Sequence, residues 1–374
     1  MIRLAIIRQR YNPFGGAERF VERALAGLAA SGEAIDVTLI TRQWSGEPAV
    51  HRQLACDPFY VGRIWRDEGF RREACRLVGA GDFDLVQSHE RLACCDIYRA
   101  GDGLHRAWLA RRERLLGAGA RFFQSLSPYH RATLAAEDAM FRGSRLRTVI
   151  CISELVKREI QEHFGLDDSR LPVVYNGVDL AQFNPSAKAR RSETRQQFTI
   201  PEEEPLFLFL GSGFERKGLA LALAALPQEA WLLVVGKDKD TARYQQLATH
   251  LGIAGRVRFA GPQKDVARFY GAADAFVFPT VYEPFGNVIL EALACGLPIL
   301  TTPDCGGAEL VREGENGFVL PGDDAEPWRV AMGQLLDGAR VRRMGEAAAA
   351  TARPFDIPTM TGRMVELYTR LMAG

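Results

Sequence analysis

Long apolar runs, metal-type cysteine spacings and a strong net charge are all missing from this chain of 374 residues. No apolar run approaches membrane-spanning length, and the opening segment 1–7 is too short for a signal sequence, so we interpret it as a first strand. Among the seven cysteines, adjacent Cys94 and Cys95 are poorly placed to bridge each other, so free thiols in a reducing cytoplasm are expected. With 47 Lys and Arg against 46 Asp and Glu, the chain is not expected to bind nucleic acid.

The charges are distributed unevenly between the two halves of the chain. Residues 1–178 carry 26 basic and 22 acidic side chains, whereas residues 179–374 carry 21 and 24. Lys157 is the single lysine of the first half, so arginine, the better fork for phosphate and carboxylate groups, supplies almost all of its positive charge. A chain of this length is too long for one ordinary core, so two domains are expected.

Short β-rich runs alternate with helix-patterned stretches along the whole chain. This alternation predicts parallel sheets covered by helices, and its two blocks predict two doubly wound, Rossmann-like α/β domains that face a central cleft. We expect the boundary near residues 176–179, and we interpret the polar stretch 184–199 as a loop. The predicted strands are 4–7, 37–41, 85–88, 148–152, 173–175, 206–210, 231–236, 257–260, 275–279, 299–302 and 317–320, and the predicted helices include 17–30, 153–164, 287–294 and 360–372.

Two carboxylates eight residues apart mark the most informative stretch, Glu283-Pro-Phe-Gly-Asn-Val-Ile-Leu-Glu291. It follows a predicted buried strand, so Glu283 is expected on the strand-to-helix loop and Glu291 on the helix. Backbone N–H groups at a helix N-terminus behind a glycine bind phosphate well, which suits Phe285, Gly286, Asn287 and Val288. An acidic residue that stabilises a helix N-terminus would explain either Glu alone, whereas the pair with its glycine favours a sugar-nucleotide site.

A second candidate site follows the predicted strand 206–210. Arg216 and Lys217 lie there among Gly211, Gly213 and Gly218, which permit close approach of the backbone. Departure of a diphosphate builds negative charge, so a transferase of this kind needs preorganised positive potential at that point. A solvated basic turn would explain an isolated Arg-Lys pair equally well.

These stretches together resemble the retaining glycosyltransferases of family 4, which have the GT-B fold. The carboxylate pair matches their E-x7-E motif, 206–218 matches their phosphate loop, and 175–179 matches an interdomain signature. The segment from Pro13 to Arg19 matches their N-terminal glycine loop. The resemblance implies an acceptor-binding domain at 1–178, completed by a C-terminal helix at 356–374, and a donor-binding domain at 179–355.

Further roles follow from the resemblance. It implies that Glu283 contacts the transferred sugar, that Glu291 accepts hydrogen bonds from the ribose, and that Arg216 and Lys217 bind the diphosphate. We expect no metal and no cofactor, because the Arg-Lys pair can do the electrostatic work of a cation. Gly15 and Gly16 are a weaker match for backbone approach to the donor, and Gln263 is a weak candidate for the nucleobase.

The segment Gly101-Asp-Gly-Leu-His105 does not match a single family pattern. Asp102 and His105 are both candidates for sugar contact or acceptor positioning, and an ordinary polar loop remains an equal alternative for each. In this retaining class the incoming hydroxyl attacks from the face of the leaving group. The diphosphate oxygen then takes the proton, so no protein base is required.

Residues 99–147 hold ten arginines and only four acidic side chains. Their basic, amphipathic pattern suits an anionic membrane surface or an acidic lipid acceptor, although a helix that packs on the first domain is compatible with it. The chain is most similar to bacterial transferases that add a hexose to the lipopolysaccharide core. That similarity implies a UDP-sugar donor, glucose as the first choice of sugar, and a lipid-linked oligosaccharide acceptor. It also implies a peripheral enzyme on the cytoplasmic face of the inner membrane.

Other functions stay open from the sequence. A capsule, exopolysaccharide or small-molecule acceptor, or a GDP-sugar donor, would keep the same donor motifs. A binding protein that has lost catalysis is disfavoured by the intact set of Arg216, Lys217, Glu283 and Glu291. An epimerase that acts on the free sugar nucleotide is disfavoured by the order of the motifs.

Overall fold

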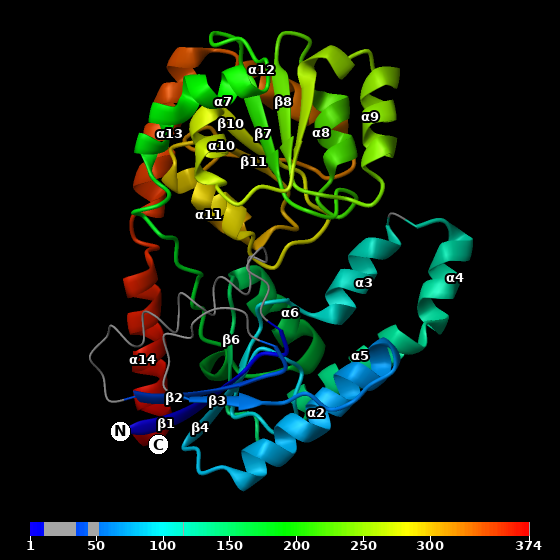
Figure 1. The fold of residues 1–374 in the computed structure, drawn as a ribbon, viewed down its shortest axis with the longest axis vertical. Helices are drawn as coiled ribbons and strands as arrows, with labels where there is room; N and C mark the ends of the chain where they lie inside the picture. Colours follow the sequence, from blue (N-terminus) through cyan, green and yellow to red (C-terminus); the bar gives the residue numbers. More distant parts are fainter. Residues whose placement is uncertain (11–34, 44–51, 115, 374) are drawn as a thin grey trace. The chain divides into compact units, whose positions relative to one another are not determined.

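The chain folds into two units, each with its own sheet and core. The structure is a computed structural model that describes residues 1–10, 35–43, 52–114 and 116–373. One unit combines Met1–Gly177 with Ile357–Gly374, and the other is formed by Val178–Asp356 (Figure 1). These bounds differ by one residue from the domain bounds inferred from the sequence. The described part of the chain includes no helix that is both long and apolar enough to span a bilayer.

The first unit is built on a six-stranded sheet with the order β3-β2-β1-β4-β5-β6, in which every pair is parallel. Two short strands, β3 and β5, were not predicted, because neither is both long and apolar. The predicted strand at 173–175 is wrong: Val173 makes only an isolated bridge to Cys151. The strands are β1 (Ile2–Ile7), β2 (Ile35–Thr41), β3 (Arg52–Ala55), β4 (Leu85–Ser88), β5 (Ile97–Arg99) and β6 (Thr148–Ile150).

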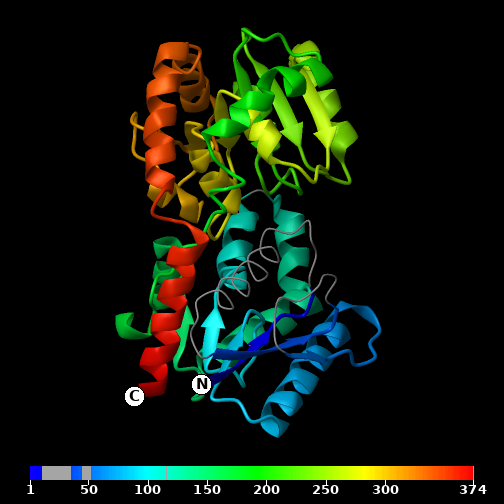
Figure 2. The same ribbon diagram turned by 60° about the vertical axis from the view of Figure 1, so that its left-hand side comes forward.

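The C-terminal helix α14 belongs to the first unit. Figure 2 shows α14 alongside the strands of the first unit. Its apolar side chains Met364 and Tyr368 are buried and belong to the same core as Leu4, Ile6 and Val37. The predicted helix 17–30 lies outside the described residues. The helices of this unit are α2 (Gly62–Ala80), α3 (His105–Glu113), α4 (Ala118–Leu126), α5 (Pro128–Phe141), α6 (Glu154–Phe164) and α14 (Ile357–Ala373).

The second unit repeats the topology in the order β12-β11-β10-β7-β8-β9, again entirely parallel. In each sheet the strand order reverses once, between β1 and β4 and between β7 and β10. Loops that leave the carboxyl ends of two such strands diverge, and ligands of doubly wound sheets bind at that point. The strands are β7 (Leu206–Leu210), β8 (Trp231–Val235), β9 (Val257–Gly261), β10 (Ala275–Phe278), β11 (Ile299–Thr301) and β12 (Gly317–Val319).

Helices cover the second sheet and bury a core that includes Phe207, Phe209 and Trp328. The loop predicted at 184–199 is wrong, because it forms a 3-10 turn at Pro185–Arg190 and then α7. Its polar sequence hid the two side chains, Thr194 and Arg195, that become buried. The helices are α7 (Arg191–Gln197), α8 (Leu219–Ala225), α9 (Thr241–His250), α10 (Ala267–Ala272), α11 (Asn287–Ala294), α12 (Ala325–Gln334) and α13 (Gly338–Ala352).

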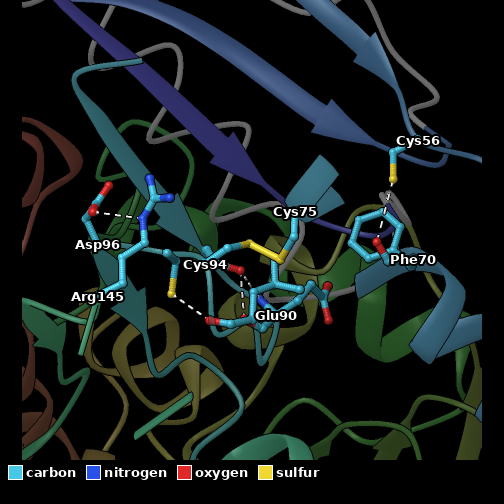
Figure 3. Close-up of a disulfide and its surroundings, with 10 residues drawn as sticks. Cys56, Phe70, Cys75, Glu90, Cys94, Asp96 and Arg145 are labelled. Atoms are coloured by element: carbon cyan, nitrogen blue, oxygen red, sulfur yellow. Dashed lines mark hydrogen bonds and ion pairs between the residues drawn. A yellow bond between two sulfur atoms is a disulfide. The ribbon is translucent and has the colours of Figure 1, made fainter. Parts of the chain in front are cut away.

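A disulfide joins Cys75 of α2 to Cys94 of the loop after β4 (Figure 3). The prediction of seven free thiols is therefore wrong for this pair. The fold brings the two cysteines to a Cα–Cα distance of 5.7 Å, which their spacing in the sequence does not reveal. The other five cysteines are free and buried.

Candidate active site

The loop after β7 carries the two cations and is shaped by glycines. Gly218 has φ +75°, and a Cβ at this position would lie 1.9 Å from the carbonyl oxygen of Pro279, so no other residue fits without backbone movement. The backbone N–H of Lys217 donates to the Gly213 carbonyl at 3.2 Å, and that of Phe214 donates to Asp238 at 2.7 Å. The loop is therefore held closely against the β10 side of the reversal point.

The loop after β10 carries Glu283 and leads into α11. The backbone N–H of Glu283 donates to the Asp304 carbonyl at 3.0 Å, and its own carbonyl accepts from Gly306 at 2.8 Å. Gly286 precedes α11 with φ +83°, and no side chain caps the helix. Asn287 and Val288 are consequently in the first turn, whose N–H groups have no acceptor within the helix.

The two loops meet in an ion-pair cluster. Glu283 Oε2 contacts both Nη1 of Arg216, at 2.9 Å, and Nζ of Lys217. Lys217 is buried and its ammonium lies 4.7 Å from the centre of the Phe278 ring. The three charged side chains therefore form one unit at the carboxyl ends of β7 and β10.

Burial and charge act in opposite directions on this cluster. Burial by itself would raise the pKa of Glu283, but Lys217 and Arg216 outweigh it and lower that pKa to about 2. Burial lowers the pKa of Lys217, and the Glu283 carboxylate opposes that change. The lowered pKa keeps Glu283 ionised near neutral pH, as the counter-ion that both cations contact.

Glu291 lies on α11, where it is buried. It is separate from the ion-pair cluster. Its Oε2 accepts a hydrogen bond from the Tyr270 hydroxyl at 3.0 Å. Phe285 is buried beside the loop. The structure thus places both carboxylates on the predicted elements, one before the helix and one within it.

Gln263 follows β9 and is not joined to the cluster. Its amide donates to the Ala260 carbonyl at 2.7 Å and accepts from Arg268 at 3.3 Å, so it contributes to the shape of its own loop. Asp238 and Asp240 have the letters of a metal motif, but the Asp238 carboxylate accepts from the backbone N–H groups of Phe214 and Asp240, and the Asp240 carboxylate pairs with Lys239. Within the described ranges, no three His, Cys, Asp or Glu side chains gather in a manner suited to a metal ion.

In the first unit, Asp102 lies at the carboxyl edge of the sheet. Its carboxylate is 3.5 Å from Arg8, which follows β1, and Arg8 is also 3.6 Å from Glu90, which follows β4. Sequence reasoning missed Arg8 and Glu90. Both are charged residues directly after predicted strands, and that signal could have identified them. Gly15 and Gly16 lie outside the described residues.

His105 is the first residue of α3, and the structure shows no contact between it and Asp102. Its Nε2 is 3.0 Å from Nδ1 of His130, and its backbone N–H donates to Glu137 at 2.7 Å. Burial, together with the nearby Arg91 and His130, lowers the pKa of His105 to about 4. The ring is therefore neutral near pH 7, where it can donate or accept a hydrogen bond.

We expect the first unit to lose stability as the pH falls from about 6.5 to about 4. The unfolded chain protonates His105 near its ordinary pKa of 6.5, whereas the folded chain resists protonation until about pH 4. The unfolded state then binds more protons, so the free energy of unfolding falls by up to ~1.4 kcal/mol per pH unit for this residue. Denaturant unfolding should show that the free energy of unfolding falls less between pH 7 and pH 5 for His105→Gln than for wild type. Equal losses would show that His105 is readily protonated in the folded state.

Family models match most of the chain in two blocks. The model described as Glycosyltransferase Family 4 matches residues 14–182, and that described as Glycosyl transferases group 1 matches residues 190–351. The chain is 30% identical to the D-inositol 3-phosphate glycosyltransferase of Nocardia farcinica, over 95% of this chain and 84% of that one. It is 27% identical to the lipopolysaccharide glucosyltransferase WaaG of Escherichia coli, over 87% and 86% of the two chains.

Solved structures agree with these matches. A crystal structure of WaaG, a glycosyltransferase involved in lipopolysaccharide biosynthesis, superposes with a TM-score of 0.81 and 25% identity, over 97% of this chain and 99% of that chain. Anabaena HepE in complex with UDP-glucose has a TM-score of 0.75 at 19% identity, over 99% and 100% of the chains, and so shares the fold. The predicted α/β architecture with two doubly wound sheets is confirmed, and the chain belongs to the family-4 glycosyltransferases with the GT-B fold.

Proposed function

We propose that this protein is a retaining hexosyltransferase that moves a sugar, with glucose as the first choice, from UDP to the lipopolysaccharide core. The observation that carries the proposal is the cluster of Arg216, Lys217 and Glu283 at the reversal point of the second sheet. The similarity to WaaG supports the acceptor, and the UDP-glucose complex of HepE supports the donor. Gly15 and Gly16 keep their proposed role near the donor.

The cluster suggests how the donor is used. As the bond from the anomeric carbon to the leaving oxygen breaks, the diphosphate gains charge, which Arg216, Lys217 and the N–H groups at Gly286–Val288 stabilise. Glu283 holds both cations in place through Oε2 and contacts the transferred sugar. The incoming hydroxyl attacks the anomeric carbon from the face that the diphosphate leaves, and its proton passes to the departing diphosphate. These two cations take the role that a metal has elsewhere.

We expect Glu291→Ala to weaken UDP binding by about 10- to 100-fold, the size of one charge-assisted hydrogen bond to a ribose hydroxyl. The test is calorimetric titration, with a chelator present, against UDP, GDP, ADP and their common sugar conjugates. Glu229→Ala, which alters an exposed carboxylate in the same unit, is the control. Preference for GDP or ADP would contradict the donor, and unchanged affinity in Glu291→Ala would contradict the ribose contact.

A phosphorylated small molecule is the second candidate acceptor. Several relatives are D-inositol 3-phosphate glycosyltransferases, and the matches to three of them cover at least 69% of the relative's length. Transfer assays with a truncated lipopolysaccharide core and with inositol phosphate as alternative acceptors separate the two. Product from inositol phosphate alone would replace the lipopolysaccharide proposal and leave the donor site intact.

We also propose that the first unit contacts an anionic membrane through residues 99–147 from the cytoplasmic side. On α4, Phe122, Phe123 and Leu126 are 61%, 74% and 52% exposed. At the start of α2, which packs on α5, Phe59 and Trp65 are 78% and 54% exposed. Exposed aromatic and aliphatic side chains close to arginines suit a lipid interface, and the α2 residues were missed from the sequence.

We expect Phe122→Ser combined with Phe123→Ser to lower binding to vesicles rich in anionic lipid about tenfold, because each ring loses apolar area that would leave water. Arg111 is a poorer target, since it contacts Glu159 at 2.8 Å. Val330→Ser, which alters a 54% exposed side chain of the second unit, is the matched control. Vesicle sedimentation in which the double variant and the control bind equally would rule out α4 as the contact.

A further inference from the structure

Glu137 is a fully buried carboxylate in the first unit that the proposed reaction does not use. It lies on α5, and its side chain has no exposed surface. Oε1 accepts from Arg91 Nε at 3.2 Å and from the His105 backbone at 2.7 Å, while Oε2 accepts from Arg106 Nε at 3.1 Å. A buried carboxylate is costly unless it is paired and hydrogen-bonded in this way.

These contacts supply a helix cap that the local sequence lacks. Leu104 is the N-cap residue of α3, and its side chain makes no capping hydrogen bond. The first N–H groups of α3, from His105 and Arg106, instead reach Glu137 at 2.7 and 3.4 Å. A negative charge is favourable at this end of a helix, so Glu137 sets where α3 begins.

Arg91 extends the same contact to the loop in front of α3. While its Nε binds Glu137, its Nη2 donates to the Gly103 carbonyl at 3.1 Å. Gly103 has φ +64°, a conformation that few other residues adopt readily. The loop between β5 and α3 is thus held through the His105 N–H on one side and through the Gly103 carbonyl on the other.

Asp102 lies on this loop between β5 and α3, directly before Gly103. Its carboxylate is 47% exposed and meets Arg8 at 3.5 Å, at the carboxyl edge of the sheet. The position of Asp102 is therefore set by backbone contacts that end on Glu137. Half-exposed Asp138, the next residue on α5, has a carboxylate that pairs, within the described residues, with Arg106 and, at 4.0 Å, with Arg142, and it does not reach the loop.

We propose that Glu137 is a positioning residue, which acts through Arg91 and the start of α3 to hold Asp102 at the sugar-transfer site. The inference rests on the proposed sugar transfer and on the candidate role of Asp102 in contacting the sugar or positioning the acceptor. Glu137 itself touches no substrate and transfers no proton. Its removal should therefore change turnover more than donor affinity, because a misplaced loop loses the reacting geometry.

The test combines steady-state kinetics with a double-mutant cycle. We expect Glu137→Gln to lower kcat by about tenfold with the donor KM within about twofold of wild type. In an Asp102→Ala background, the same substitution should change kcat by less than about twofold, because the residue it positions has gone. Asp138→Asn, one residue along α5, is the matched control and should keep wild-type kcat.

Hydrogen exchange of the segment 100–110 gives a readout that does not depend on activity. Glu137→Gln should speed exchange at the His105 and Arg106 amides by about tenfold, whereas Asp138→Asn should not. If Glu137→Gln does not fold, Arg91→Lys keeps the charge beside Glu137 and removes the fork to Gly103. It should give the same pattern of lower kcat with unchanged donor KM.

Three results would overturn the proposal. They are kcat losses of Glu137→Gln and Asp102→Ala that multiply when the two are combined, a fully active Asp102→Ala enzyme, and unchanged hydrogen exchange of the amides in Glu137→Gln. Failure of the proposed function is recognised separately. If wild-type protein transfers no sugar from any UDP donor, that function is wrong. The exchange experiment alone then decides whether Glu137 holds the loop.

Discussion

Replacing Lys217 by alanine is expected to lower sugar transfer by about two to three powers of ten, the loss seen when one preorganised transition-state donor is removed. Lys217 is buried, its ammonium contacts Glu283, and it lies over the face of Phe278. A charge kept away from water acts more strongly on a departing diphosphate than an exposed one does. Single-turnover kinetics at saturating donor measures the effect on the chemical step.

Lys239→Ala provides the control for this experiment. Lys239 is also a lysine of the second unit, but its side chain is 89% exposed and its ion pair with Asp240 is open to water. Such a pair contributes little, so this variant should keep wild-type turnover. If Lys217→Ala turned over at the wild-type rate, Lys217 would have no part in the reaction and Arg216 would have to supply the charge alone.

Replacing Arg195 by methionine is expected to destabilise the second unit by about 3–5 kcal/mol, because it breaks a buried charged network. Arg195 is 1% exposed on α7. Its guanidinium donates to the carbonyls of residues 201, 202, 204 and 272 at 2.7–2.9 Å and contacts Asp274 at 2.8 Å. Asp274 also accepts from the Leu206 N–H at 2.8 Å, where β7 begins, so the network anchors the first strand of the sheet.

Thermal unfolding should report this loss as a fall of roughly 6–20 °C in the transition of the second unit, given about 2–4 °C per kcal/mol for a unit of this size. Arg190→Met is the matched control. Arg190 is 45% exposed and pairs with Glu193 and Asp265 at the surface, so its transition should stay close to that of wild type. Equal shifts in the two variants would mean that the carbonyl contacts of Arg195 contribute nothing beyond an ordinary surface pair.

The sequence predicted correctly which elements carry the two glutamates, because each placement follows from a local pattern. Alternation of apolar strands with helices placed Glu283 on a loop and Glu291 on α11, whose bounds were predicted as 287–294. Gly218 could be recognised as a conformational requirement, and the structure adds that Pro279 leaves no room for a side chain there. Patterns of this kind are set by neighbours in the chain.

Features that depend on distant contacts could not be predicted. Polar sequence around Arg195 suggested a loop, yet tertiary contacts made a helix with a buried guanidinium. Cys75 and Cys94 gave no sign of a disulfide, because α2 has to pack on the loop after β4 before they meet. Glu137 looked like one more acidic residue in an Arg-rich segment.

By itself the sequence determined the α/β class, the two-domain organisation and the family, since these follow from periodicity and from motifs within short stretches. Only the tertiary structure decided which charges meet. Lys217 and Glu283 are 66 residues apart and come into contact because β7 and β10 are adjacent strands. Asp102 meets Arg8 for the same reason, because parallel strands bring the ends of remote segments to one edge, where charges on their loops pair directly. Glu137 meets the start of α3 because α5 packs on that helix.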